Sequence, residues 1–141
     1  MNTLNFTGHV VSGKQLGRTI GFPTANLVVN RTQIDTHGVF AVTVHHAGNQ
    51  YAGVMNIGVR PSFEDGTHTT VEVHILDFAG DLYGDTLMVE TIAFLRPEQA
   101  FENLEALVAQ LKEDVRQARK LVEPNYMYGR MMTPPVTIAL A

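Results

Sequence analysis

The sequence predicts a mostly β domain, an antiparallel barrel or curled sheet with one amphipathic helix laid against it. Two observations predict this class. Five segments rich in Val, Ile, Thr, Phe and Tyr alternate with turn-forming residues, so neighbouring strands are expected to pair as antiparallel hairpins. One helical pattern follows all of the strands, which is typical of a helix packed on a sheet or barrel.

Turn compositions separate the predicted strands. Residues 47–50 read Ala-Gly-Asn-Gln, residues 64–66 read Glu-Asp-Gly and residues 79–81 read Ala-Gly-Asp, and all three stretches favour tight turns. The β-branched and aromatic residues between them suit a pleated, half-buried surface. The expected strands are residues 6–11, 38–46, 51–58, 69–78 and 86–94.

Residues 98–122 carry the predicted helix. Pro97 and Pro124 bracket this segment, and its apolar residues recur at steps of three and four. The apolar positions are Phe101, Leu104, Leu107, Val108, Leu111, Val115, Ala118 and Leu121. We therefore expect the barrel and its helix in residues 1–123 and a tail of unknown role in residues 124–141.

The composition describes a single small domain with a slightly acidic surface. The chain has 141 residues, no cysteine, and 14 acidic against 10 basic side chains, a formal net charge of −4. This balance argues against an electrostatic nucleic-acid surface or a polybasic membrane surface. No apolar run approaches the ~20 residues of a membrane helix, and residues 1–8 lack the pattern of a secretion signal. We expect a cytoplasmic monomer that binds neither nucleic acid nor membrane.

The first segment with chemical character is rich in glycine. Glycine recurs every four residues from Gly13 to Gly21, with Arg18 among them. Glycines let backbone amides approach a polyanion, and arginine offers a fork of donors to phosphate. Residues 8–14 match the first seven Walker A positions, but Gln15 replaces the hydroxyl residue that holds Mg²⁺, which argues against an ordinary Walker loop. The segment either holds nucleotide phosphates or is a turn-rich connection with a solvated arginine.

Thr24 and Asn26 directly follow this segment. Pro23 favours extended backbone after it, and in extended backbone residues two apart share a face. A hydroxyl and an amide oxygen are hard neutral ligands that suit Mg²⁺ already carrying phosphate oxygens. The alternative is a turn in which these side chains bond their own backbone.

A carboxylate stands in the middle of a β-branched strand. Alternation places Val71, Val73 and Ile75 on one face and Glu72 and His74 on the other. If the second face is solvated, Glu72 is an ordinary surface residue. If that face lines a cleft, the sheet holds Glu72 as a general base. A third interpretation makes Glu72 and His74 two ligands of a metal-dependent enzyme.

Further motifs follow in order along the chain. Pro23-Thr-Ala-Asn26 comes after the glycine-rich loop, and Asn56-Ile-Gly-Val-Arg-Pro-Ser-Phe63 and Leu95-Arg-Pro-Glu-Gln-Ala-Phe101 succeed it. In these motifs, over residues 6–123, the chain resembles the riboflavin kinase (flavokinase) family, including the kinase module of bifunctional FAD synthetases.

The resemblance implies a fold, a reaction and a set of site residues. The fold is a six-stranded antiparallel Greek-key barrel with one C-terminal α-helix. The reaction transfers the γ-phosphoryl group of ATP to the 5′-hydroxyl of riboflavin, giving FMN and ADP, with Mg²⁺. The implied catalytic carboxylate is Glu72 and the implied metal ligands are Thr24 and Asn26. The implied ATP contacts are Gly13, Arg18, Thr24, Asn26, Ile75, Asp77 and Tyr83, and the implied flavin contacts are Arg96, Gln99 and Phe101.

Among the implied ATP contacts, Asp77 is the one that the family pattern supports least. The residue at this position varies in the family, and in a regular strand Asp77 would face away from Glu72. Two other functions stay open beside the kinase: a flavin- or nucleotide-binding barrel without catalysis, and a metal-dependent β-barrel enzyme that uses Glu72 and His74.

Overall fold

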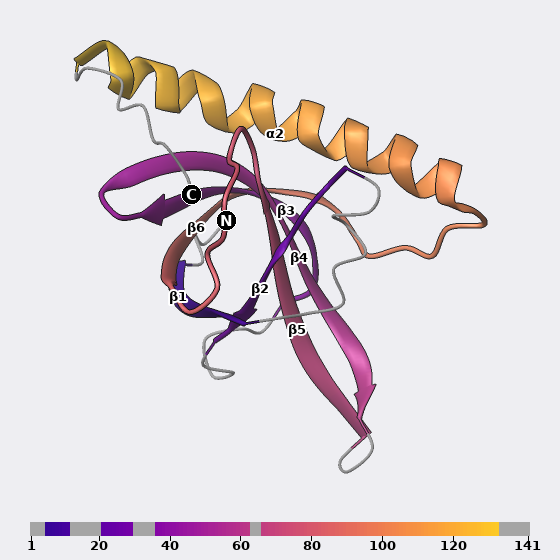
Figure 1. Ribbon diagram of the computed structural model, residues 1–141. Coiled ribbons are helices and arrows are strands. Elements are labelled where there is room, and N and C mark those ends of the chain that lie inside the picture. Colours follow the sequence, from indigo (N-terminus) through magenta and orange to yellow (C-terminus); the bar gives the residue numbers. More distant parts are fainter. Residues whose placement is uncertain (1–4, 12–20, 30–35, 63–65, 133–141) are drawn as a thin grey trace.

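The computed structural model describes residues 5–11, 21–29, 36–62 and 66–132, of which residues 61, 62, 67 and 123–132 are described by their backbone alone (Figure 1). These residues include six strands and one long helix. They are β1 (Asn5–Val11), β2 (Ala25–Val28), β3 (Gly38–His46), β4 (Asn49–Ser62), β5 (Gly66–Ile75), β6 (Thr86–Arg96) and α2 (Leu104–Met132).

The strands close into a barrel in the order β1-β2-β5-β4-β3-β6, and every neighbouring pair is antiparallel. β3, β4 and β5 form a meander of consecutive neighbours. β2, which precedes this meander in the chain, lies beside its last strand, β5, and this is a Greek-key arrangement. The expected Greek-key barrel with one C-terminal helix is confirmed. β2 is the strand that periodicity alone left out, because it spans only four residues.

The described residues form two hydrophobic clusters, one on each side of the barrel wall. The interior is filled by fully buried side chains that include Val42, Met55 and Val73. The second cluster lies outside the wall, where Val39, Ala41 and Val54 meet Ala118 and Val122 of the helix. α2 accordingly lies across β4, β3 and β6 (Figure 1). In the described part of the chain, no helix combines the length and apolarity needed to span a membrane.

Three predicted boundaries are wrong: the end of β5 and both ends of the helix. The strand predicted to reach residue 78 ends at Ile75, because a turn follows it and Asp77 adopts a left-handed backbone with φ of 58°. The helix begins at Leu104 rather than residue 98. Its start is fixed by Asn103, whose side-chain oxygen accepts a hydrogen bond from the Ala106 amide at 2.8 Å.

The other end of the helix also differs from the prediction. α2 continues through Pro124 to Met132, whereas the proline predicted a stop near residue 122. Proline removes one helical hydrogen bond and biases the residue before it against helix, but this bias does not by itself set a boundary.

Candidate functional site

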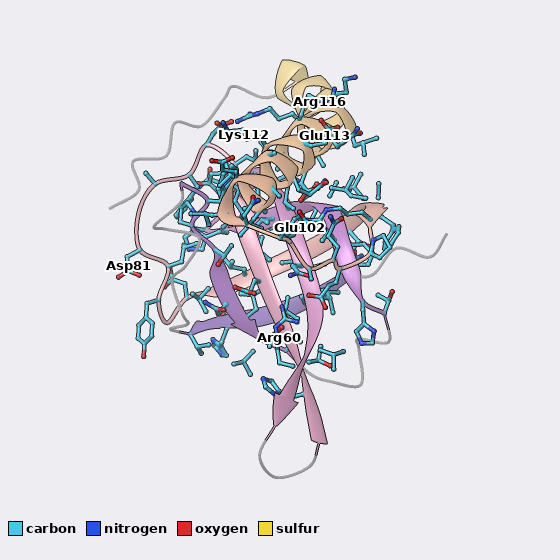
Figure 2. All side chains as sticks on the ribbon, turned by 90° about the vertical axis from the view of Figure 1, so that its right-hand side faces the viewer. Arg60, Asp81, Glu102, Lys112, Glu113 and Arg116 are labelled. Atoms are coloured by element: carbon cyan, nitrogen blue, oxygen red, sulfur yellow. The ribbon has the colours of Figure 1, made fainter. Side chains whose placement is uncertain are left out.

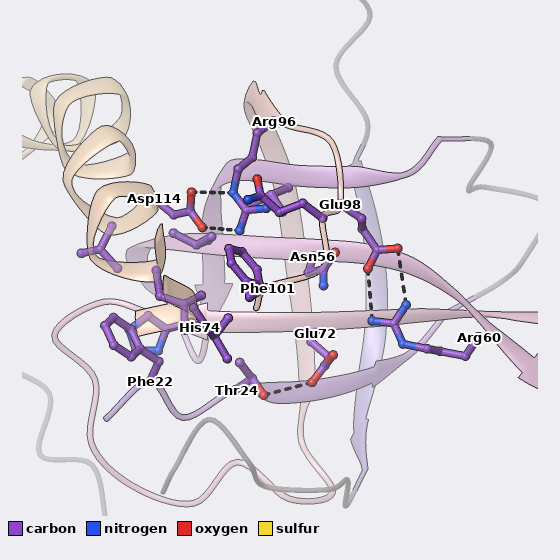
Figure 3. Close-up of a pocket in the computed structure, with 16 residues that line it drawn as sticks. Phe22, Thr24, Asn56, Arg60, Glu72, His74, Arg96, Glu98, Phe101 and Asp114 are labelled. Carbon is purple, nitrogen blue, oxygen red and sulfur yellow. Dashed lines mark hydrogen bonds and ion pairs between the residues drawn. The ribbon is translucent and has the colours of Figure 1, made fainter. Parts of the chain in front are cut away.

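A pocket of about 310 Å³ lies between the outer wall of the barrel and the N-terminal half of α2 (Figure 3). One of its sides is apolar and is formed by Val39, Val54, Leu107, Leu111 and Val115. Charged and polar side chains form the other sides, and they come from the segment before β2, from β4, β5 and β6, from the segment between β6 and α2, and from α2 itself. The pocket therefore joins an apolar surface to a set of groups capable of acid–base and ionic chemistry.

Strand pairing brings three polar side chains into one row on the outer wall. Glu72 of β5 stands opposite Asn26 of β2 on one side and Asn56 of β4 on the other. Directly paired residues point to the same face, and the opposite face is taken by Val71 and Val73, which are buried in the interior. Glu72 thus lines the pocket and is not an ordinary surface residue.

Thr24 and Glu72 meet in this pocket. The Thr24 hydroxyl donates a hydrogen bond to Glu72 Oε1 at 3.3 Å, and Figure 3 shows the two side chains facing each other. Asn26 does not line the pocket, but it is the cross-strand neighbour of Glu72. Hydroxyl, amide and carboxylate oxygens gathered in this way are the hard donors that Mg²⁺ prefers, so the residues present fit that ion.

His74 holds the segment that leads into β2. Its Nδ1 lies 2.7 Å from the Pro23 carbonyl oxygen, and because a carbonyl only accepts, Nδ1 must donate. The His74 ring also meets Phe22 edge-on, with ring centroids 5.6 Å apart. Within the described ranges, no group of three His, Cys, Asp or Glu side chains is placed to hold a metal ion. The interpretation with Glu72 and His74 as metal ligands therefore gains no support.

Arg96 forms a two-pronged ion pair with a carboxylate of the helix. Its Nε donates to Asp114 Oδ1 at 2.8 Å and its Nη2 donates to Asp114 Oδ2 at 2.7 Å. Gln110 adds a hydrogen bond to the same carboxylate at 2.9 Å. The guanidinium carbon lies 5.8 Å from the centre of the Phe101 ring, a cation–π contact. The fork of Arg96 is thus engaged by Asp114, and its planar group lies against Phe101 at the pocket.

Asp114 was not among the predicted site residues, although the sequence carries a signal for it. Asp114 falls three residues after Leu111 and one before Val115, on the face of the helix that meets the barrel. It is only 2% exposed. Buried carboxylates are rare unless they are paired, so a lone aspartate within an apolar stripe predicts a cationic partner on the facing element.

A second ion pair closes another side of the pocket. Arg60 Nη2 donates to Glu98 Oε2 at 3.1 Å and Arg60 Nη1 donates to Glu98 Oε1 at 3.4 Å. Burial by itself raises the pKa of Glu98, but the hydrogen bond and charge of Arg60, with hydrogen bonds from Asn56 and the Val59 amide, lower it overall. Glu98 is therefore an anion at neutral pH. Neither residue of this pair was among the predicted site residues.

Comparisons with known proteins identify the family. The family model described as "Flavokinase: Riboflavin kinase" matches residues 1–122. The chain belongs to the riboflavin kinase family. A bifunctional riboflavin kinase/FMN adenylyltransferase from Pseudomonas fluorescens is 44% identical over 118 residues, which cover 84% of this chain and 38% of that protein. The chain thus spans well under half the length of this relative.

Two solved structures resemble the riboflavin kinase fold described above. A Streptococcus pneumoniae structure described as a macrolide-efflux protein has a TM-score of 0.77 and 40% identity, covering 82% of this chain and 38% of that one. A riboflavin kinase from Trypanosoma brucei has a TM-score of 0.64 and covers 98% of this chain and 94% of that one. Its identity is 24%, so this likeness concerns the fold alone.

The residues predicted from the riboflavin kinase resemblance divide into three groups. Thr24, Glu72, Arg96, Gln99 and Phe101 all line the pocket. Gly13 and Arg18 lie outside the described residues. Asn26, Ile75, Asp77 and Tyr83 do not line the pocket.

Asn26 is the cross-strand neighbour of Glu72, and the other three residues of the last group lie in three different environments. Ile75 is part of the interior cluster, and Tyr83 is 67% exposed. Asp77 pairs with Arg119 of the helix at 2.8 and 2.9 Å. The hydrogen bond from Arg119 is the main cause that lowers the pKa of Asp77. Their roles toward ATP stay predictions.

Proposed function

We propose that this chain is an ATP-dependent riboflavin kinase, which transfers the γ-phosphoryl group of ATP to the ribityl 5′-hydroxyl of riboflavin. The observation that carries the proposal is the convergence of Thr24 and Glu72, 3.3 Å apart, in a pocket with one apolar wall. Membership of the riboflavin kinase family supports the same reaction.

Glu72 is the residue that we assign to the proton. Phosphoryl transfer depends mainly on in-line positioning and on neutralising charge, so the protein needs little covalent chemistry. A primary alcohol is too weak an acid for a carboxylate to deprotonate in advance. Glu72 therefore orients the hydroxyl and accepts its proton as the bond to phosphorus forms. Help of this kind is worth about 10²–10⁴-fold in rate.

Thr24 and Asn26 are the residues that we assign to Mg²⁺. Both offer uncharged oxygens beside the Glu72 carboxylate, a donor set suited to a hard cation that also carries phosphate oxygens. Mg²⁺ bound with ATP supplies positive charge that offsets the charge on the phosphates. Gly13 and Arg18 are proposed to hold the phosphates, and Ile75, Asp77 and Tyr83 the rest of the nucleotide.

Arg96, Gln99 and Phe101 are proposed to bind the flavin. The apolar wall of the pocket suits a flat fused-ring system, and Phe101 offers an aromatic face beside it. Asp114 fixes the guanidinium of Arg96 at the same place, so this face of the pocket is held before a substrate arrives.

The test is direct. The purified protein is incubated with riboflavin, ATP and Mg²⁺, and the flavins are separated by chromatography. We expect FMN and ADP in equal amounts. Tight riboflavin binding without FMN would instead identify a binding barrel without catalysis. The monomeric state, the cytoplasmic location and the absence of nucleic-acid or membrane binding remain predictions from the sequence.

A further inference from the structure

The segment between β6 and α2, residues 97–103, forms one side of the pocket. It contributes Glu98, Gln99 and Phe101 to the pocket lining, although none of its residues belongs to a strand or helix. No ladder of backbone hydrogen bonds fixes such a segment, so side chains must hold it. How it is held decides where Gln99 and Phe101 stand.

Glu98 fastens this segment to β4. It receives two hydrogen bonds from Arg60, and the nearby Asn56 side chain also lowers its pKa. Figure 3 shows Glu98 opposite Arg60, with Asn56 nearby. The three β4 positions involved, residues 56, 58 and 60, are two apart and so share one face of the strand.

Gly58 makes room for this contact. A Cβ atom added to Gly58 would lie 2.5 Å from Glu98 Oε2 and 2.6 Å from Arg60 Nη1. The ion pair therefore rests directly on the backbone of β4, at a position where any side chain would displace it. The Glu98 carboxylate therefore packs against β4 at Gly58 and does not extend into solvent.

The residues that lead into the segment are held independently of Glu98. Arg96 is bound to Asp114 of the helix and also donates to the Pro97 carbonyl at 3.2 Å. Glu98 is two residues after Arg96, the Phe101 ring lies against the Arg96 guanidinium, and Asn103 caps α2 at the end of the segment. Without Glu98, the chain from Pro97 to Asn103 would have one fewer of these attachments, and that stretch contains both Gln99 and Phe101.

We propose that Glu98 is a positioning residue for the flavin: by docking on Arg60, Asn56 and Gly58 of β4 it holds Gln99 and Phe101 in the binding conformation. The inference deepens the proposed function and rests on it. The pair is partly exposed, with side-chain exposures of 41% for Arg60 and 31% for Glu98. Partly exposed ion pairs add little to folding stability, so its effect falls on substrate binding.

The experiment is a double-mutant cycle on riboflavin affinity. Glu98→Ala, Arg60→Ala and the double variant are titrated with riboflavin in the presence of MgADP, following the quenching of flavin fluorescence. If residues 97–103 of a variant without this ion pair adopt the binding conformation only about one tenth of the time, the apparent Kd for riboflavin rises about tenfold. Glu98→Ala should show this rise, and Arg60→Ala should show a rise no larger than that, because Asn56 and the Val59 amide still contact Glu98 in that variant. The double variant should show no more than Glu98→Ala alone. Tm should stay within about 2 °C of wild type.

The helix offers a matched control. Glu113 and Arg116 form a similar partly exposed pair, with Arg116 donating to Glu113 at 2.9 and 2.6 Å, and neither residue lines the pocket. Figure 2 shows this pair on the helix and Arg60 on the barrel. Glu113→Ala and Arg116→Ala should leave the riboflavin Kd unchanged.

The outcomes separate this inference from the proposed function. Three results would each overturn the positioning role. They are an unchanged riboflavin Kd in both Glu98→Ala and Arg60→Ala, effects of the two replacements on Kd that simply add in the double variant, and an equal rise in Kd when Glu113 or Arg116 is replaced. The positioning role would also be overturned if Glu98→Ala and Arg60→Ala both lowered Tm and weakened the binding of riboflavin and of the nucleotide alike. If wild-type protein binds riboflavin but forms no FMN, the kinase proposal falls while the cycle still decides the role of Glu98. If wild type binds no riboflavin, both fall.

Discussion

Thr24 and Glu72 are 48 residues apart in the sequence, yet the hydroxyl of one donates to the carboxylate of the other at 3.3 Å. β2 and β5 bring them together, because Asn26 pairs with Glu72 and Thr24 precedes the strand by one residue. A candidate metal ligand and a candidate proton acceptor therefore share one wall of one pocket, as one reaction centre requires.

Replacing Glu72 tests the proton-accepting role. Glu72→Gln keeps the size and shape of the side chain and its ability to form hydrogen bonds, but the amide cannot accept a proton. We expect kcat to fall about 10²–10⁴-fold, with KM for ATP and riboflavin little changed. Steady-state kinetics of FMN formation measure this. Wild-type turnover in the purified variant would remove the assignment.

Replacing Thr24 tests the metal site. Thr24→Ala deletes one candidate oxygen ligand, so more Mg²⁺ should be needed for half-maximal rate. Thr7, an exposed residue of β1, gives a matched control, since Thr7→Ala removes the same group outside the pocket. The measurement is a Mg²⁺ titration of initial rates, and superimposable curves for Thr24→Ala and wild type would contradict the assignment.

Breaking the Arg96–Asp114 pair should destabilise the fold. Asp114 is 2% exposed, and removing one partner of a buried pair leaves the other charge uncompensated. We expect Asp114→Ala to lower the free energy of unfolding by about 3 kcal/mol. The double replacement Arg96→Met with Asp114→Leu should recover part of this loss. Urea denaturation followed by circular dichroism compares them, and a double variant less stable than Asp114→Ala would be inconsistent with this account.

The Asp77–Arg119 pair should make a pH-dependent contribution to stability. Arg119 holds the pKa of Asp77 below its ordinary value of 3.8 in the folded state. Stabilisation is therefore complete above that value and is lost as pH falls through the lower, folded-state pKa. The difference in Tm between wild type and Asp77→Asn should persist from pH 7 to pH 5 and shrink in more acidic solution. A difference that grows on acidification would show the opposite sign.

The sequence predicted local features better than contacts between distant segments. Alternation around Glu72 correctly separated it from Val71 and Val73, because the two-residue period of a strand is a local property. Whether its face met a cleft or solvent depended on which strands lay beside β5, and periodicity does not contain that information. The family motifs supplied it.

The ion pairs of the pocket were missed for a related reason. Arg60 and Glu98 are 38 residues apart, and either alone resembles any solvated charge. Their pairing depends on the closeness that Gly58 permits, which becomes visible only when β4 and the segment after β6 are placed together. The end of β5 was likewise misjudged because Asp77 adopts a backbone conformation that strand-forming neighbours do not signal.

β5 serves two surfaces at once, since Val71, Val73 and Ile75 fill the interior while Glu72 and His74 line the pocket. Sliding this strand by a single residue would bury a carboxylate and an imidazole in hydrocarbon and present valines to the pocket. Misfolded molecules of that kind would be unstable as well as inactive. The packing of the interior and the lining of the pocket therefore depend on one and the same pairing of β5 with its neighbours.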